Sequence, residues 1–137
     1  MAFNRKALIW GTGVFIILYV VHLLLLPLLV GTEQGGKASD AMLYGIHQFL
    51  GLTTCLVPGF VAARLAQRSG FLHGFTVGGL GTLVTALAAV IWSLLTGAKF
   101  PALDTFPFWL LVNGFLSAFA GLIASNSNEE ESERRVV

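Results

Sequence analysis

The chain has 137 residues, of which 55% are hydrophobic and only 11% are charged, and its mean hydropathy is +0.80. Soluble domains carry roughly 25% charged residues, so this sequence has too little charge to cover a water-facing surface. Its formal net charge of +1 also lacks the basic excess that is typical of nucleic-acid-binding proteins. The composition therefore predicts a multi-pass membrane protein that binds no nucleic acid.

Four long apolar segments account for most of the chain, at about 7–30, 41–66, 71–95 and 106–124. The first is longer than the apolar part of a secretory signal and no small-x-small cleavage site follows it, so it is interpreted as a retained span. The last is the shortest, but it is close to the ~20 residues that a spanning helix needs. The sequence therefore predicts an all-α, four-helix transmembrane bundle that forms a single domain over residues 1–124.

The last residues, 125–137, read SNSNEEESERRVV and show no apolar periodicity. Polar, charge-dense segments of this kind cannot bury enough apolar surface to pack against a core. We expect a largely disordered tail.

A proline lies inside the second span, at Pro58, and Gly59 follows it. Proline removes a helical hydrogen bond, so a kink is expected there. A freed carbonyl is tolerated in a membrane only where a neighbouring group satisfies it, which predicts that this part of the helix is well surrounded.

The distribution of Lys and Arg predicts the orientation. With four spans, both termini and the turn between the second and third helices share one side of the membrane. Because positive residues concentrate on the cytoplasmic side, both termini are predicted to be cytoplasmic. Six of the eight Lys and Arg residues fall on that side: Arg5, Lys6, Arg64, Arg68, Arg134 and Arg135, against Lys37 and Lys99 on the other.

Small residues recur at four-residue spacing on the third span and again on the fourth. Such rows let helix backbones approach closely, which is how helices associate in lipid. Two interpretations stay open: packing of the four helices against one another, or docking of a partner protein or second copy. The predicted packing face comprises Gly74, Gly78, Thr82, Ala86, Gly114, Ala118 and Gly121, and an offset row on the third span comprises Gly81, Thr85, Ala89 and Ser93.

A cluster of polar residues is predicted near the outer leaflet. Tyr19 and His22 are three residues apart on the first span, Tyr44 and His47 are three apart on the second, and Gln48 follows. Residues at that spacing share a helix face. His22 lies about 12 Å and His47 about 9 Å from the outer ends of their helices, at ~1.5 Å per residue. The two imidazoles can therefore meet if the first two helices are neighbours.

Three interpretations of this cluster stay open, because ionisable residues inside a span are costly to bury and are functional candidates by default. The histidines can be neutral and hydrogen-bonded, they can handle a proton or substrate, or they can hold a haem iron axially. No carboxylate or thiolate lies nearby to complete a metal shell, so the expected cofactor is none, with haem b through His22 and His47 as the alternative.

The two arginines at the end of the second helix, Arg64 and Arg68, are four residues apart. Their expected role is to fix topology and to reach the lipid headgroups.

Several chemistries are disfavoured by what the sequence lacks. No Asp or Glu falls inside any of the four apolar segments, whereas small drug exporters with four helices depend on a membrane-embedded carboxylate. The single cysteine, Cys55, cannot form an internal disulfide. No P-loop, HExxH, GxSxG or CxxC motif is present, so we expect the protein not to be an enzyme.

The central hairpin, Gly59–Gly79, reads GFVAARLAQRSGFLHGFTVGG. It resembles the central hairpin of uncharacterised families of small four-helix bacterial membrane proteins, which share a Gly-x-x-Ala-x-Arg helix end, a short basic turn and a Gly-x-x-His-Gly start. The resemblance implies a four-span fold in the bacterial inner membrane and no particular activity.

The leading functional hypothesis is a non-enzymatic structural or accessory subunit that packs against itself or a larger membrane complex. The alternative is a small transporter or channel, and the third is a membrane anchor that carries haem. The polar track of the transporter hypothesis consists of Tyr19, His22, Tyr44, His47, Thr54, Thr82 and Asn113.

Overall fold

The structure, a computed structural model, describes residues 3–31, 40–67, 69–99 and 103–134, with side chains described over 3–25, 42–67, 69–99 and 103–127. The described residues form four long helices and one short 3-10 turn, without strands. The prediction of an all-helical protein with four long apolar helices is confirmed. The helices are α1 (Arg5–Gly31), α2 (Asp40–Ala66), α3 (Gly70–Thr96) and α4 (Phe106–Arg134), and η2 (Leu103–Thr105) precedes α4.

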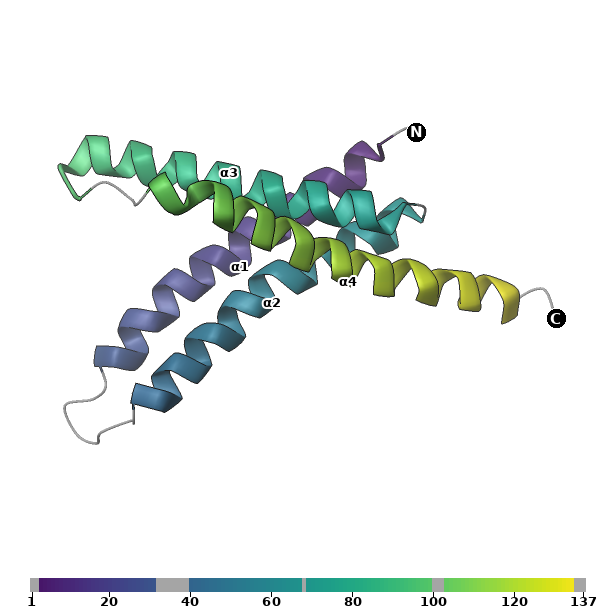
Figure 1. Cartoon of the computed structure of the whole chain (residues 1–137), viewed down its shortest axis with the longest axis horizontal. Coiled ribbons are helices and arrows are strands. Elements are labelled where there is room, and N and C mark those ends of the chain that lie inside the picture. The colour runs from purple at the N-terminus through teal and green to yellow at the C-terminus, as the bar shows by residue number, and fades with distance from the viewer. Residues whose placement is uncertain (1–2, 32–39, 68, 100–102, 135–137) are drawn as a thin grey trace.

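The first three helices begin and end within two residues of the predicted bounds, but α4 does not. It runs to Arg134, ten residues beyond the expected end at 124, and extends past the other helices (Figure 1). The prediction of a largely disordered tail over 125–137 is therefore wrong as far as Arg134; residues 135–137 lie outside the described residues. Glu and Arg are good helix formers, and adding residues to an existing helix costs far less than starting one.

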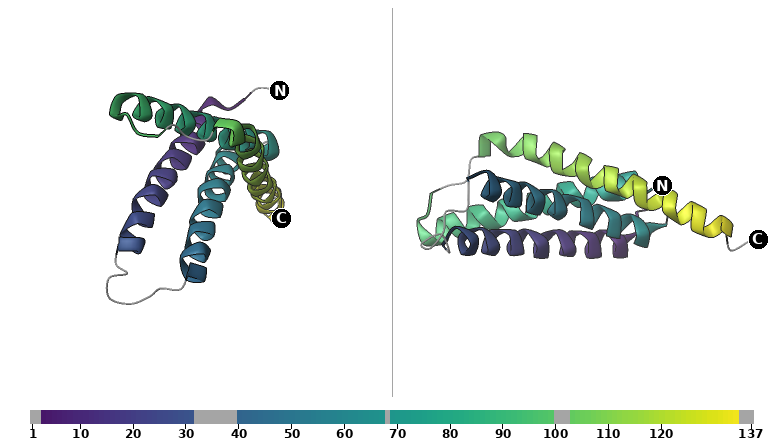
Figure 2. Two further views of the ribbon diagram at one scale, coloured as in Figure 1. Left: turned by 60° about the vertical axis from the view of Figure 1, so that its left-hand side comes forward. Right: turned by 90° about the horizontal axis from the view of Figure 1, so that it is seen from below.

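The four helices form two hairpins, α1–α2 and α3–α4, which pack together at one end and diverge at the other (Figures 1 and 2). We call the packed end, where α2 ends and α3 begins, the turn end, and the opposite one the connector end. The most extensive contact is between α3 and α4, whereas α1 and α4 make no contact within the described residues.

The buried residues of α1, α2 and α3 are concentrated at the turn end. Among the described side chains of α1, only Ala7, Gly11 and Phe15 in its first half are buried, and the buried residues of α2 lie between Thr54 and Ala63 in its second half. All buried residues of α3 lie in its first half except Ser93. The core therefore fills the turn end, and the connector-end halves of the two hairpins face outward or each other.

Glycine permits the close packing of α4 in the core. A Cβ atom added to Gly59 of α2 or to Gly74 of α3 would collide with the backbone of Ser117, and one at Gly78 would collide with the backbone of Asn113. The α4 backbone therefore lies directly against both helices, and the Ser117 side chain between them is fully buried. This is the close approach that small residues allow in membrane bundles.

Each helix has a stretch long and apolar enough to cross a membrane: Arg5–Leu25, Met42–Ala66, Gly70–Thr96 and Leu103–Ser127. At most a third of the most apolar part of each stretch is buried, and the exposed side chains include many large apolar ones. Exposed apolar area of this extent is typical of a surface in contact with lipid, so the fold is that of a membrane protein.

Candidate ligand-binding cleft

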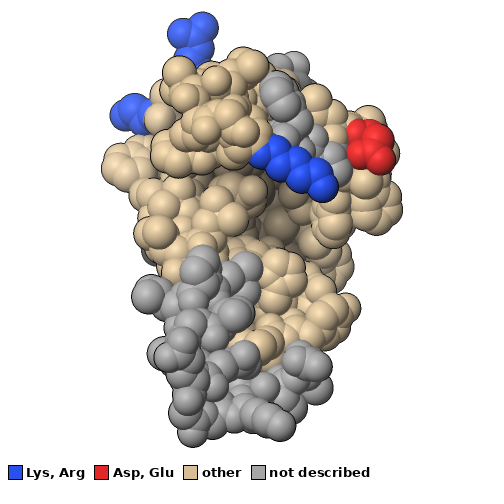
Figure 3. Space-filling model, turned by 90° about the vertical axis from the view of Figure 1, so that its left-hand side faces the viewer, with Lys and Arg blue, Asp and Glu red and all other residues tan. Residues whose placement is uncertain are grey.

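A cleft lies between the two hairpins where they diverge. Its larger part has a volume of about 540 Å³ between α1 and α3, and its smaller part, about 290 Å³, reaches across to α4. The two parts share Tyr19, Thr85 and Ala89 as lining residues, so they lie next to each other. Figure 3, which looks onto the connector end, shows this face hollowed between the hairpins. Volumes of this size are typical of small-molecule sites.

The two walls of the cleft carry side chains of different size, mostly large on α1 and mostly small on α3. The α1 wall carries Ile16, Tyr19, Val20 and Leu23, whereas the α3 wall carries Thr85, Ala88, Ala89 and Ser93 with Val84 and Trp92. Because the α3 side chains are short and α1 diverges from α3, the space between the walls is not filled. The offset row of small residues on α3 therefore lines a cleft along much of its length instead of seating a neighbouring helix.

The first residues of both rows of small residues on α3 are occupied by other helices of the chain. Gly74 and Gly78 pack on α4, and Gly81, the first residue of the offset row, receives the ring of Phe15 from α1. On α4, Gly121 lies against Gly70, Gly114 lies against the Phe75 ring, and Ala118 is fully buried.

The inner end of the cleft is polar. The Asn113 amide nitrogen donates to the Thr82 hydroxyl at 2.9 Å, and the amide oxygen accepts from the Cys55 thiol at 3.3 Å. Asn113 and Thr82 both line the cleft. One asparagine thus joins α2, α3 and α4 and offers an amide to any molecule that reaches this depth.

The part of α2 around Pro58 is joined to α4 by a further polar contact. The helix continues through Pro58, whose side chain is fully buried. The neighbouring carbonyl of Cys55 accepts a hydrogen bond of 2.7 Å from the Ser117 hydroxyl on α4. The expectation that neighbours surround this part of α2 is thus met by a buried hydroxyl from another helix.

His22 and His47 meet across the α1–α2 contact. The distance between His22 Nε2 and His47 Nδ1 is 3.0 Å, and the ring centroids are 4.9 Å apart at an angle of 56°. One imidazole must donate and the other accept in such a bond. Gly51 leaves room for the His22 ring, which lies 3.8 Å from the position of an added Cβ.

This geometry does not fit an axially ligated haem iron. Metal–imidazole bonds are ~2.0 Å long, so two axial nitrogens with iron between them are roughly 4 Å apart, and the observed 3.0 Å leaves no room for it. Within the described residues there is also no group of three or more His, Cys, Asp or Glu side chains able to hold a metal ion.

The other predicted cluster residues separate. Tyr19 lies in the cleft and lines both of its parts. Tyr44 is 66% exposed, and Gln48 is exposed as well, so both point outward from α2. Of the predicted cluster, only His22 and His47 are in contact in the structure. Tyr19, Tyr44 and Gln48 lie on other surfaces.

The turn end is closed by a group of hydrogen bonds around Asn4. Its backbone N–H donates to His73 Nε2 at 3.0 Å, and its side-chain nitrogen donates to the Leu65 carbonyl at 3.1 Å. His73 Nδ1 lies 3.1 Å from the Ser69 carbonyl, which fixes the tautomer with the proton on Nδ1. We call the contacts of Asn4 with Leu65 and His73 the Asn4 latch.

The position of Asn4 immediately before the first helix is a sequence signal for a helix cap. Its side-chain oxygen accepts from the N–H groups of Lys6 and Ala7 at 3.1 and 3.3 Å, which is the capping that Asn provides immediately before a helix. His73, which accepts from the Asn4 backbone, is only 4% exposed.

The arginines at this end keep a peripheral position. Arg64 is exposed, and its guanidinium lies 5.6 Å from the centre of the Phe60 ring, a cation–π contact. Arg68 lies outside the described residues. Nothing in this arrangement joins Arg64 to the cleft.

Comparison with protein families, curated proteins and solved structures finds no match to this chain. The resemblance of the central hairpin therefore stays a prediction, and function is inferred from the geometry of the cleft alone.

Proposed function

We propose that this protein is a small, non-enzymatic membrane carrier that takes up an amphiphilic molecule in the cleft between its two hairpins. The observation that carries the proposal is a pair of adjacent spaces of about 540 and 290 Å³ with mostly apolar walls, the smaller of which reaches the polar side chains of Thr82 and Asn113. A mostly apolar space with a few converging polar groups is the usual form of a ligand site.

The asymmetry of the fold supports transport over simple binding. The turn end is closed by the core and by the Asn4 latch, whereas the hairpins diverge at the connector end. Carriers expose one site to one side at a time by rocking one helical unit against another. The two hairpins are suited to be those units, with the Asn113 network near their crossing point.

The orientation completes the proposal. With six of eight Lys and Arg residues on the side of the termini, both termini and the Asn4 latch are cytoplasmic and the cleft opens outward. The hairpin resemblance supports a location in the bacterial inner membrane.

Cysteine accessibility tests the carrier function without knowledge of the substrate. In a Cys55→Ser background, Thr85→Cys should react with a charged, membrane-impermeant thiol reagent added on the connector side, because Thr85 lines both parts of the cleft. The matched control is Leu87→Cys, which is two residues away on α3 and 54% exposed; it lines neither part, so in lipid it should not react.

The carrier function also predicts that opening one end closes the other. Asn4→Ala removes the side-chain part of the latch and should lower the labelling of Thr85→Cys from the connector side and raise it from the turn side. Labelling that stays the same in Asn4→Ala, or a Thr85→Cys that reacts no faster than Leu87→Cys, would refute the proposal.

An accessory role is the second candidate, favoured by a different surface. Tyr44, His47 and Gln48 are exposed on the connector-end half of α2, inside a span. Polar side chains that face lipid are costly, so a partner helix with polar groups is expected to cover them. Gln48→Leu should then release a protein that copurifies in mild detergent, and retention of that protein would exclude this interface.

A further inference from the structure

We infer that the molecule held in the cleft is an anionic phospholipid, with one acyl chain between α1 and α3 and its phosphate at Lys99. This inference rests on the proposed function, because it names the ligand of the same cleft. It is carried by a positively charged side chain at the rim of a cleft whose walls are mostly apolar and partly exposed to the bilayer.

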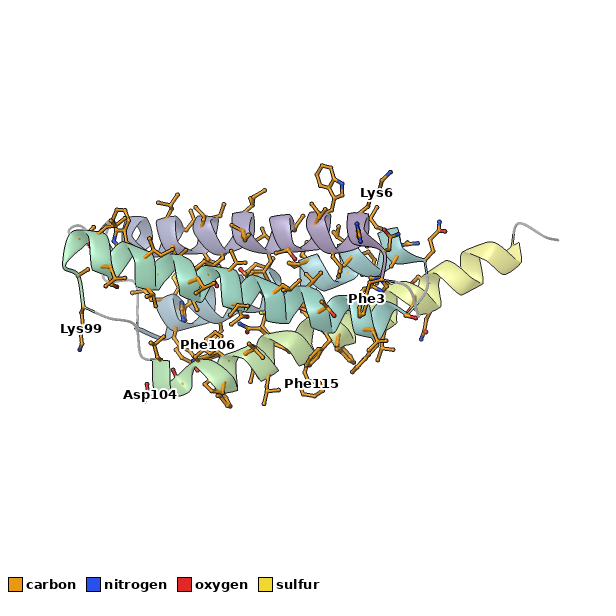
Figure 4. All side chains as sticks on the ribbon, turned by 90° about the horizontal axis from the view of Figure 1, so that it is seen from above. Phe3, Lys6, Lys99, Asp104, Phe106 and Phe115 are labelled. Atoms are coloured by element: carbon orange, nitrogen blue, oxygen red, sulfur yellow. The ribbon has the colours of Figure 1, made fainter. Side chains whose placement is uncertain are left out.

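Lys99 is at the rim. It lines the larger part of the cleft and is exposed, and Figure 4 shows it at the connector end, far from Lys6 at the turn end. Its backbone is held there: Gly97, with φ of 69°, ends α3, and the Lys99 carbonyl accepts from the Ser93 hydroxyl at 3.3 Å. An ammonium group so placed is a suitable partner for a phosphate.

Below the rim, the lining is mostly apolar. Trp92 lines the cleft with Lys99 near the end of α3, and such a ring favours the level of the headgroups. Aliphatic side chains of α1 and α3 make up most of the remaining wall. Val20, Leu23 and Val84 are exposed as well as lining, so a chain can enter sideways from the bilayer.

Charge favours an anionic over a zwitterionic headgroup. Among the side chains that the structure describes, Lys99 is the sole charged one that lines either part of the cleft. Asp104, another charged residue at the connector end whose side chain is described, lines neither part (Figure 4). A basic residue near the membrane surface typically contributes about a fivefold preference for an anionic surface, which is the size of effect expected for its removal.

Native mass spectrometry of the full chain tests the inference. The protein is released from nanodiscs that contain equal amounts of phosphatidylglycerol and phosphatidylcholine with identical acyl chains. One phosphatidylglycerol should be retained in preference to phosphatidylcholine, and Lys99→Gln should lower that preference about fivefold. Lys6→Gln, which removes the same charge from an exposed position at the turn end, should leave it unchanged.

A second pair of variants separates the site from its headgroup preference. Ala88→Leu fills the cleft and should abolish retention of both lipids. Gly79→Leu adds the same side chain to α3 where an added Cβ meets nothing within 4 Å, and it should have no effect; circular dichroism checks that both variants fold.

The outcomes distinguish a failure of the anionic-headgroup inference from a failure of the cleft as a ligand site. Loss of lipid in Ala88→Leu without any effect of Lys99→Gln would overturn the anionic headgroup while leaving a ligand cleft in place. If Ala88→Leu also leaves lipid retention unchanged, both the inference and the cleft as a ligand site are overturned.

Discussion

Two adjacent glycines of α3 test how α4 is seated. A Cβ atom at Gly78 would collide with the Asn113 carbonyl and come within 2.7 Å of the Ser117 hydroxyl, whereas one at Gly79 would meet nothing within 4 Å. Both positions are helical. Replacing each by alanine therefore makes the same chemical change in two different environments.

The expected effects have opposite signs. Gly79→Ala should stabilise the protein by about 0.4–1 kcal/mol, because alanine restricts the unfolded chain where the native backbone accepts it. Gly78→Ala has the same backbone gain, but the methyl group must push α4 away, and overpacking of this kind typically costs about 1–3 kcal/mol. Because the backbone term cancels between the two variants, their free energies of unfolding should differ by about 1–3 kcal/mol, roughly 5- to 160-fold in the equilibrium constant.

The difference can be measured by titrating the folded protein in mild detergent with sodium dodecyl sulfate and following its helix content or tryptophan fluorescence. A second pair on α1 provides an independent repeat: an added Cβ at Gly11 lies 2.8 Å from Val77 and 2.9 Å from Ala62, whereas one at Gly13 meets nothing within 4 Å. If Gly78→Ala is as stable as Gly79→Ala, the close seating of α4 on α3 is wrong.

Three further predictions concern the polar contacts. A double-mutant cycle of Asn113→Leu and Thr82→Val should give a coupling of about 0.6–1.7 kcal/mol, the range for hydrogen bonds between membrane helices; additive effects would show that the 2.9 Å bond contributes nothing. Asn4→Ala should lower the free energy of unfolding by about 0.5–2 kcal/mol through loss of the α1 cap, with Asn4→Ser retaining most of it. A double-mutant cycle of His22→Leu and His47→Leu should likewise give a coupling of about 0.6–1.7 kcal/mol across the 3.0 Å contact, and additive effects would contradict this.

Much of the fold follows from properties that the sequence displays locally. The length of the apolar segments gives four helices, and the bounds of α1, α2 and α3 follow within two residues because polar and glycine-rich stretches flank them. The exception is α4, whose polar extension to Arg134 shows that helix propensity, not apolar content, decides where a helix ends once it has left the lipid.

The contacts between elements follow from the sequence less completely. The depths of His22 and His47 were sufficient to bring them together, because adjacent helices joined by a short connector are neighbours. Cys55 lies on α2, whereas its partners Asn113 and Ser117 lie on α4, and no spacing along the chain relates the two helices. Which faces of α2, α3 and α4 meet is decided by side-chain fit across the whole bundle.

The small residues of α3 show why a pattern alone does not determine function. The two rows look equivalent in the sequence, and both permit close approach of another helix. Gly74 and Gly78 have such a neighbour in α4, whereas Thr85 and Ala89 do not, because α1 diverges after Phe15 has filled the space at Gly81. A row that seats a helix stabilises the fold, and the same kind of row facing a diverging helix leaves a cavity. The direction of α1 beyond Phe15 therefore determines that this protein has a cleft, and with it the site that a ligand can occupy.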